Sequence, residues 1–214
     1  MVEVGKKLGK KICAVISNMN DPLGQAVGNS IEVIESIEFL KGNTKKDLKD
    51  VTFELAYLTL IKTGKAKTQD EAVKMLEDAL KSGKALQKFK DLIISQGGDP
   101  SVIEDYSKFP QAKHVIEIKA SKEGYINHIK ALEIAKATKL LGAGRTLKED
   151  PIDYAVGIYL NKKSGEYIKK GETAFTIYAD SLDNIEDVKT MAQNAFIIEN
   201  SAKKQDELIY KVID

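Results

Sequence analysis

The chain has 214 residues, and its 33 Lys and Arg residues almost balance its 32 Asp and Glu residues, which gives a formal net charge of +1. Such a chain lacks the surplus of cations that nucleic-acid phosphates or an anionic membrane surface would require, so we expect neither as a partner. With 43% hydrophobic residues it can bury a core, and no apolar run reaches the roughly 18 residues of a membrane span.

The first 28 residues are predicted to contain a short helix, a buried strand and a loop. Residues 2–8 have the pattern of a helix that lacks an N-cap and ends at Gly9. Residues 12–16 form a continuous apolar run, which favours a parallel strand covered by helices on both faces. Cys13, the single cysteine, lies in this run and has no disulfide partner within the chain, which fits a reducing, cytoplasmic location. Residues 17–28 are polar and punctuated by glycine, which indicates a loop.

Residues 29–96 are predicted to form a block of helices, because apolar residues recur there every three or four positions. Asn29 with Glu32, and Thr68 with Glu71, have the spacing of capping boxes and would begin two of these helices. The predicted breaks between and after the helices are glycines, at positions 42, 64, 83 and 97.

The pattern changes near Phe109-Pro110, and we place a domain boundary there, which divides the chain into residues 1–107 and 108–214. The second part mixes strand-like and helix-like segments, so we expect an α+β domain. The strands are predicted at residues 115–118, 124–126, 153–160, 167–168 and 174–179, and the helices at residues 129–141 and 185–195.

The segment from Ser164 to Glu172 is similar to the hammerhead of biotinyl and lipoyl carrier domains, in which two tight turns flank one short strand. This pattern predicts a barrel-sandwich-hybrid-like fold. A carrier also needs a modifiable lysine at a hairpin tip, in a Met-Lys-Met or Asp-Lys-Ala context, and residues 110–180 contain none. We therefore predict the fold without the carrier function.

Two other groups of residues invite a functional interpretation and do not support it. Gly142-Ala143-Gly144-Arg145 lacks the Lys-Ser/Thr of a phosphate-binding loop and follows a helix, so it is interpreted as the glycine end of that helix. His114 begins a strand and His128 lies on a predicted surface, and neither has a Cys, His or carboxylate at ligand spacing. We interpret both histidines as ordinary residues.

The loop before residue 29 carries the most informative pattern. Gly24 and Gly28 let the backbone fold tightly and present carbonyl oxygens, and Glu35 lies in the second turn of the following helix, from which its carboxylate can fold back. Carbonyls with one carboxylate make a hard, weakly charged oxygen site, suited to a monovalent cation. On the residues alone, the ordinary interpretation of Glu35 as a solvated helix residue is preferred.

Six segments resemble, in colinear order, the pyrimidine-nucleoside and thymidine phosphorylases: Pro22 to Val33, Leu80 to Leu86, Gln96 to Pro100, Leu141 to Arg145, Glu149 to Asp153, and Val156 to Ile158. The resemblance spans essentially the whole chain. It implies an α/β plus α+β fold, in which residues 1–107 are part of the family's central α/β domain with its helical block. Residues 108–214 are then the family's C-terminal α+β domain.

The family catalyses reversible phosphorolysis, in which a pyrimidine nucleoside and phosphate give the base and a pentose 1-phosphate. The groups that bind phosphate and pyrimidine lie upstream of this segment, so the resemblance transfers no catalytic or substrate-binding residue. It does imply a potassium-like monovalent cation held by the backbone carbonyls of Leu23 and Ala26 and the carboxylate of Glu35, with further ligands from the upstream phosphate loop.

The resemblance also aligns Met1 with an internal position of the family. We therefore expect the chain to be the C-terminal part of a cytoplasmic enzyme that is a homodimer when complete, and to be inactive without the N-terminal part. Two alternatives stay open. One is a non-catalytic assembly or binding module, and the other is part of a nucleotide phosphorylase that acts on nucleoside monophosphates.

Overall fold

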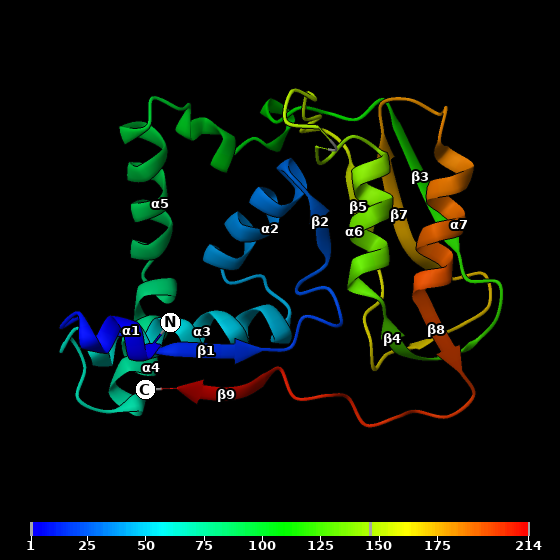
Figure 1. The fold of residues 1–214 in the computed structure, drawn as a ribbon. Helices are drawn as coiled ribbons and strands as arrows, with labels where there is room; N and C mark the ends of the chain where they lie inside the picture. The colour runs from blue at the N-terminus through cyan, green and yellow to red at the C-terminus, as the bar shows by residue number, and fades with distance from the viewer. Residues whose placement is uncertain (1, 146, 214) are drawn as a thin grey trace.

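The strands of the computed structural model, which describes residues 2–145 and 147–213, form three antiparallel sheets (Figure 1). The sheets have the strand orders β1-β9, β2-β5-β7-β3 and β6-β4-β8. The strands are β1 (Ala14–Ser17), β2 (Ala26–Gly28), β3 (His114–Lys119), β4 (Gly124–Ile129), β5 (Gly157–Leu160), β6 (Tyr167–Ile168), β7 (Thr173–Ala179), β8 (Phe196–Glu199) and β9 (Ile209–Ile213).

Helices α2 to α5 occupy the predicted helical block, and α6 and α7 lie in the second part of the chain (Figure 1). The helices are α1 (Val2–Lys7), α2 (Ser30–Leu40), α3 (Lys46–Lys62), α4 (Gln69–Lys81), α5 (Lys84–Ser95), α6 (Ala131–Leu140) and α7 (Ile185–Ala195). Two short 3-10 helices, Pro100–Ile103 and Tyr106–Lys108, lead to β3. None of the described helices combines the length and the apolar character needed to cross a membrane.

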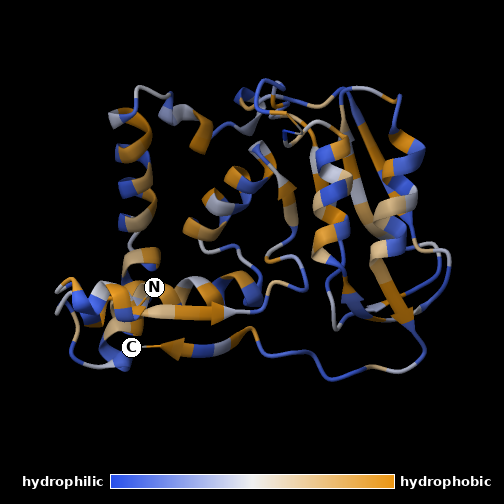
Figure 2. Ribbon diagram, in the orientation of Figure 1, coloured by the Kyte–Doolittle hydropathy of each residue, from blue (hydrophilic) through white to orange (hydrophobic). Residues whose placement is uncertain are grey.

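The prediction of a buried parallel strand over residues 12–16 is wrong. In the structure β1 begins at Ala14, one residue after the half-buried Cys13, and pairs antiparallel with β9. Its burial is incomplete, and Ile16 is 45% exposed. Figure 2 shows β1 as apolar along most of its length. An apolar run predicts that a strand is covered, but it carries no information about the direction of the strand that pairs with it.

The α+β character predicted for residues 108–214 agrees with the structure, whose second part combines antiparallel strands with α6 and α7. Two sheets combine strands from both sides of the predicted boundary at residue 107, because β2 pairs with β5 and β1 pairs with β9. The division into domains, and the assignment of residues 1–107 to a central α/β domain, remain predictions.

The main core lies between the β2-β5-β7-β3 sheet and the two helices α6 and α7. Its members without exposed surface include Phe175, Ile177, Ile158, Leu160, Ile134 and Val188. Phe175 also stacks on Phe196, with ring centroids 5.3 Å apart. By contrast, α3 and α5 contain no fully buried residue. The sheet that includes β2 is therefore the best-anchored part of the described chain.

The turn and capping predictions were confirmed in part. The hammerhead-like turns are present on both sides of β6, where the Glu166 N–H donates to the Lys163 carbonyl and the Glu172 N–H donates to the Lys169 carbonyl. Thr68 caps α4 by accepting the Glu71 N–H. The prediction of a capping box formed by Asn29 and Glu32 at the start of α2 is wrong.

Asn29 makes no capping hydrogen bond at α2, because its side-chain amide donates to the Ala143 carbonyl at 2.9 Å. Glu32 instead accepts the Gly28 N–H at 2.9 Å. Asn29 thus bonds a distant carbonyl in place of the backbone N–H donors that a cap would use. Gly142, with φ +104°, ends α6 as predicted.

Candidate functional site

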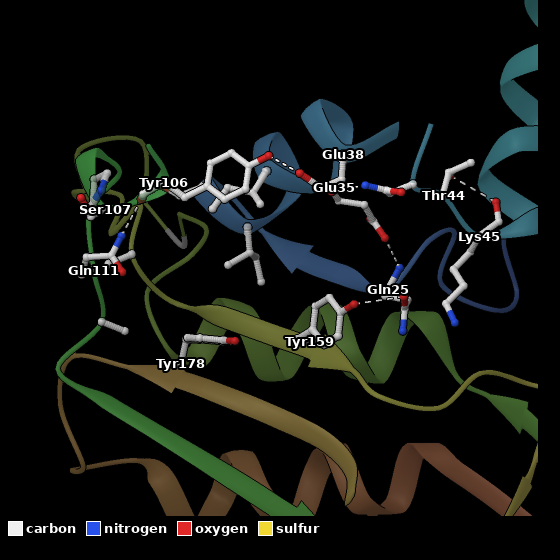
Figure 3. A pocket seen from close by; sticks show the side chains of 17 residues that line it. Gln25, Glu35, Glu38, Thr44, Lys45, Tyr106, Ser107, Gln111, Tyr159 and Tyr178 are labelled. Carbon is white, nitrogen blue, oxygen red and sulfur yellow. Dashed lines mark hydrogen bonds between the residues drawn. The ribbon is translucent and has the colours of Figure 1, made fainter. Parts of the chain in front are cut away.

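The carboxylate of Glu35 folds back from α2 onto the loop at residues 21–26 that leads into β2. Its Oε1 accepts the Gln25 N–H at 2.7 Å and its Oε2 accepts the Ala26 N–H at 3.3 Å (Figure 3). Glu35 is half-buried. The interpretation of Glu35 as a solvated helix residue is therefore wrong, because backbone donors in the loop replace water around the carboxylate.

Gly24 makes this approach possible. Its φ is +68°, a left-handed conformation that other residues adopt at a cost, and a Cβ placed on it would lie 2.5 Å from Glu35 Oε2. The loop therefore needs glycine at this position for two independent reasons, its backbone conformation and the space that the Glu35 carboxylate occupies.

The carbonyl groups of the loop are divided among different partners. The Pro22 and Gly24 carbonyls both accept the ammonium group of Lys163, and the Gln25 carbonyl accepts the Leu160 N–H at 2.8 Å. Among the described residues, no backbone N–H donates to the Leu23 carbonyl.

The geometry of the β2–β5 pair accounts for the Ala26 carbonyl. Hydrogen-bonded and non-hydrogen-bonded pairs alternate along an antiparallel ladder. Because Gln25 and Leu160 form a bonded pair, the next pair, Ala26 with Tyr159, is a non-bonded one. The N–H and C=O of Ala26 therefore point away from β5, which agrees with the bond from its N–H to Glu35. Of the carbonyls of residues 22–26, those of Leu23 and Ala26 are thus the two that accept neither a backbone N–H from the described part of the chain nor the Lys163 ammonium.

Lys163 holds the loop from the turn between β5 and β6. Its ammonium lies 3.0 Å from Asp47 Oδ2, and its side chain is only 12% exposed. The same Asp47 oxygen accepts the Gly24 N–H at 3.1 Å. Neither Lys163 nor Asp47 was singled out from the sequence, because they lie far from the loop along the chain and match no local motif.

Asp21 ties the start of the loop to β4 and to the same turn. Its Oδ1 accepts the Ile129 N–H at 2.6 Å and the Ser164 hydroxyl at 2.7 Å, and it lies 2.9 Å from His128 Nδ1. His128 therefore has a carboxylate partner 107 positions away in the chain, which no search at ligand spacing along the sequence finds. His114 begins β3, as predicted.

A cavity of about 740 Å³ lies beside this loop, between α2 and the sheet (Figure 3). Tyr159 from β5 donates its hydroxyl to Gln25 Oε1 at 3.0 Å, and the buried Gln25 donates its side-chain amide to the Leu160 carbonyl at 2.8 Å. Burial raises the pKa of Tyr159, and the negative charge of Glu35 adds to this effect. Glu35 thus faces a partly enclosed space in which its charge is felt by its neighbours.

The pKa of Glu32, one turn before Glu35, is also raised. Burial is the largest cause, the hydrogen bond from Gly28 opposes it, and the charge of Glu35 adds to it. Among the described residues, no three His, Cys, Asp or Glu side chains gather as a metal cluster. The donors at this loop are therefore carbonyls and one carboxylate, the oxygen ligands that hard cations prefer.

The comparisons with known proteins first give the class of protein. Residues 125–199 match the family model described as the pyrimidine nucleoside phosphorylase C-terminal domain. This segment runs from β4 to the end of β8 and includes the hammerhead-like turns and Lys163. Residues 125–199 are therefore similar to the C-terminal domain of pyrimidine nucleoside phosphorylases.

Curated proteins then extend the similarity to the whole chain. It is 45% identical to a pyrimidine-nucleoside phosphorylase of Staphylococcus epidermidis, 44% to one of Bacillus subtilis and 43% to one of Geobacillus stearothermophilus. Each match covers 213 residues, 100% of this chain and 49% of the relative. The chain is therefore similar over its whole length to the C-terminal half of pyrimidine-nucleoside phosphorylases, and it spans about half the length of these relatives.

Proposed function

We propose that this chain supplies the C-terminal half of an enzyme that cleaves pyrimidine nucleosides with phosphate, giving the free base and a pentose 1-phosphate. The names of its relatives support this reaction. In this proposal the N-terminal half provides the groups that bind phosphate and pyrimidine. The complete enzyme is a cytoplasmic homodimer, and its substrates are a pyrimidine nucleoside and phosphate.

Within this enzyme, the proposed role of residues 21–35 is to bind a monovalent cation such as potassium through the Leu23 and Ala26 carbonyls and the Glu35 carboxylate. The observation that supports the proposal is the division of the loop carbonyls, in which those of Leu23 and Ala26 have no backbone donor among the described residues and lie beside the Glu35 carboxylate. A bound cation would supply positive charge that fixes these oxygens in place, and the N-terminal half would add the remaining ligands.

The cation assignment is tested by thermal unfolding of the chain in complex with the N-terminal half of the Bacillus subtilis relative, which supplies the remaining ligands, in potassium chloride and in tetramethylammonium chloride at equal ionic strength. Potassium should raise the stability, by about 1.4 kcal/mol at a concentration ten times its dissociation constant. Glu35→Gln should abolish the difference between the two salts. Glu32→Gln, one turn earlier on α2 and bonded to Gly28 instead, is the matched control and should keep it. An unchanged potassium response in Glu35→Gln removes Glu35 from the site.

The reaction is tested by measuring phosphate-dependent release of uracil or thymine from uridine or thymidine. The pure chain should be inactive, and activity should appear when it is mixed with the N-terminal half of the Bacillus subtilis relative. Turnover by the chain alone would contradict the assignment of the catalytic groups to the other half. An inactive but stable mixed complex would support a non-catalytic assembly module, and activity confined to nucleoside monophosphates would support a nucleotide phosphorylase.

A further inference from the structure

Lys163 places its ammonium group inside the loop that is proposed to bind a cation. Its ammonium group has three N–H donors, and three acceptors surround it: the Pro22 carbonyl, the Gly24 carbonyl and the Asp47 carboxylate. With 12% of the side chain exposed, little water reaches this group. Every donor of the ammonium is therefore used by the loop or by the residue that the loop contacts.

Asp47 and Lys163 together bind both polar groups of the Gly24 backbone. One carboxylate oxygen, Oδ2, accepts both the Lys163 ammonium and the Gly24 N–H, while the ammonium also binds the Gly24 carbonyl. Both polar groups of the Gly24 backbone are thus fixed by one ion pair. Because Gly24 has a left-handed conformation and lies against Glu35, fixing its peptide groups also fixes where the neighbouring carbonyls point.

The next residue of the same turn supports the loop at its other end. Ser164 donates its hydroxyl to Asp21, so consecutive side chains of the turn hold the loop at residues 21 and 22–24. The preceding residue behaves differently. Lys162 forms an ion pair with Glu172 at 2.8 Å, and its side chain is 24% exposed. The two adjacent lysines are therefore a natural pair for comparison.

We propose that Lys163 is the positioning residue of the cation loop. Its ammonium group binds the Pro22 and Gly24 carbonyls, so that the Leu23 and Ala26 carbonyls stay available to a cation from solution. The loop-ordering part stands on the contacts of Lys163 alone. The part that concerns potassium rests on the proposed function.

Amide hydrogen exchange of the full chain tests the loop-ordering part without added potassium. Lys163→Met keeps the length of the side chain and removes the charge. It should accelerate exchange at Gly24, Gln25 and Ala26 by about tenfold or more relative to Phe175 in the core, which reports global opening. Lys162→Met should leave this ratio within about twofold of the wild-type value. Equal exchange in the two variants overturns the proposal.

A chemical rescue separates charge from packing and covers the case in which Lys163→Met does not fold. Lys163→Cys, made in a Cys13→Ala background, is alkylated in urea and refolded. Alkylation with 2-bromoethylamine restores an ammonium at nearly the same reach and should restore slow exchange at Gln25 and Ala26. Alkylation with iodoacetamide, which adds a neutral amide, should not. Equal protection in the two alkylated proteins overturns the proposal.

The potassium response of the same proteins distinguishes the ordering of the loop by Lys163 from the binding of a cation by the loop. Loss of the wild-type potassium response in Lys163→Met but not in Lys162→Met supports both. A wild-type complex with the N-terminal half that shows no potassium response refutes the cation function, while accelerated exchange in Lys163→Met still supports Lys163 as the residue that orders the loop. A normal potassium response with unaltered exchange in Lys163→Met refutes the inference about Lys163 and leaves the cation function standing.

Discussion

Gly24→Ala should destabilise the chain far more than the same substitution at a glycine with the same backbone conformation. At Gly24 the new Cβ would lie 2.5 Å from Glu35 Oε2 and 2.9 Å from its Cδ, so the carboxylate has to leave. Gly64 is the matched control, because its φ of +71° is close to the +68° of Gly24 and nothing lies within 4 Å of its Cβ position.

The expected magnitudes follow from these two environments. An alanine in the left-handed region costs about 1–2 kcal/mol, and this is the whole effect expected at Gly64. At Gly24 the displaced carboxylate also loses its 2.7 Å bond to the Gln25 N–H, and a hydrogen bond to a charged group is worth about 1.5–3 kcal/mol. The bond to Ala26 is long, at 3.3 Å, and adds little. Gly24→Ala should therefore lower the free energy of unfolding by about 2.5–5 kcal/mol.

Urea unfolding of four proteins measures this difference: wild type, Gly24→Ala, Glu35→Ala and the double variant, with Gly64→Ala as the control. In the Glu35→Ala background there is no carboxylate to displace, so Gly24→Ala should cost only the strain, about 1–2 kcal/mol. If Gly24→Ala costs the same in both backgrounds, or no more than Gly64→Ala, the contact between Gly24 and Glu35 does not shape the loop.

Two further predictions concern the core and the linker after α5. Phe175→Ala, which empties a fully buried site, should lower the free energy of unfolding by about 3–5 kcal/mol in urea titrations, and a loss below about 1 kcal/mol would contradict the assignment of the core. The hydrogen bond from Tyr106 is the largest cause that holds the pKa of Glu38 below its ordinary 4.5, so its stabilisation is present above about pH 4.5 and is lost as the pH falls through the lower folded-state pKa. Tyr106→Phe should therefore destabilise the chain at pH 6 and progressively less as the pH falls below 4.5, whereas an effect that does not change with pH would refute the coupling.

Local patterns were enough to predict the helices and several strands. The glycines at 42, 64, 83 and 97 stand at the helix ends and have positive φ, which is a property of the residue itself and needs no tertiary context. The three missed strands, β2, β8 and β9, are different. β2 has only three residues, and its partner β5 lies about 130 positions further along the chain. Such a strand exists because of its partner, so its own residues cannot predict it.

The residues of the candidate site also differ in how far local patterns could predict them. Helical spacing after a glycine-containing loop showed that the Glu35 carboxylate could reach that loop, but the residues alone favoured a solvated side chain, because the backbone donors that hold it are set by the fold. Lys163, Asp47 and Asp21 were not predictable, since each contacts the loop through the tertiary fold, and a lysine in a polar turn has the same local pattern whether it is solvated or enclosed. The adjacent Lys162, which pairs with Glu172 instead, shows that the sequence does not distinguish the two lysines.

The charges around the loop favour a cation with a single positive charge. Asp47 is matched by the Lys163 ammonium at 3.0 Å, and Asp21 accepts the Ile129 N–H and the Ser164 hydroxyl and lies 2.9 Å from His128 Nδ1. Within residues 2–145 and 147–213, Glu35 has no ion-pair partner and relies on backbone N–H groups. Its charge is felt nearby, because it contributes to the raised pKa of Tyr159. The Glu35 carboxylate, beside the neutral carbonyls of Leu23 and Ala26, balances one positive charge. A divalent ion would leave an excess positive charge in a partly enclosed site.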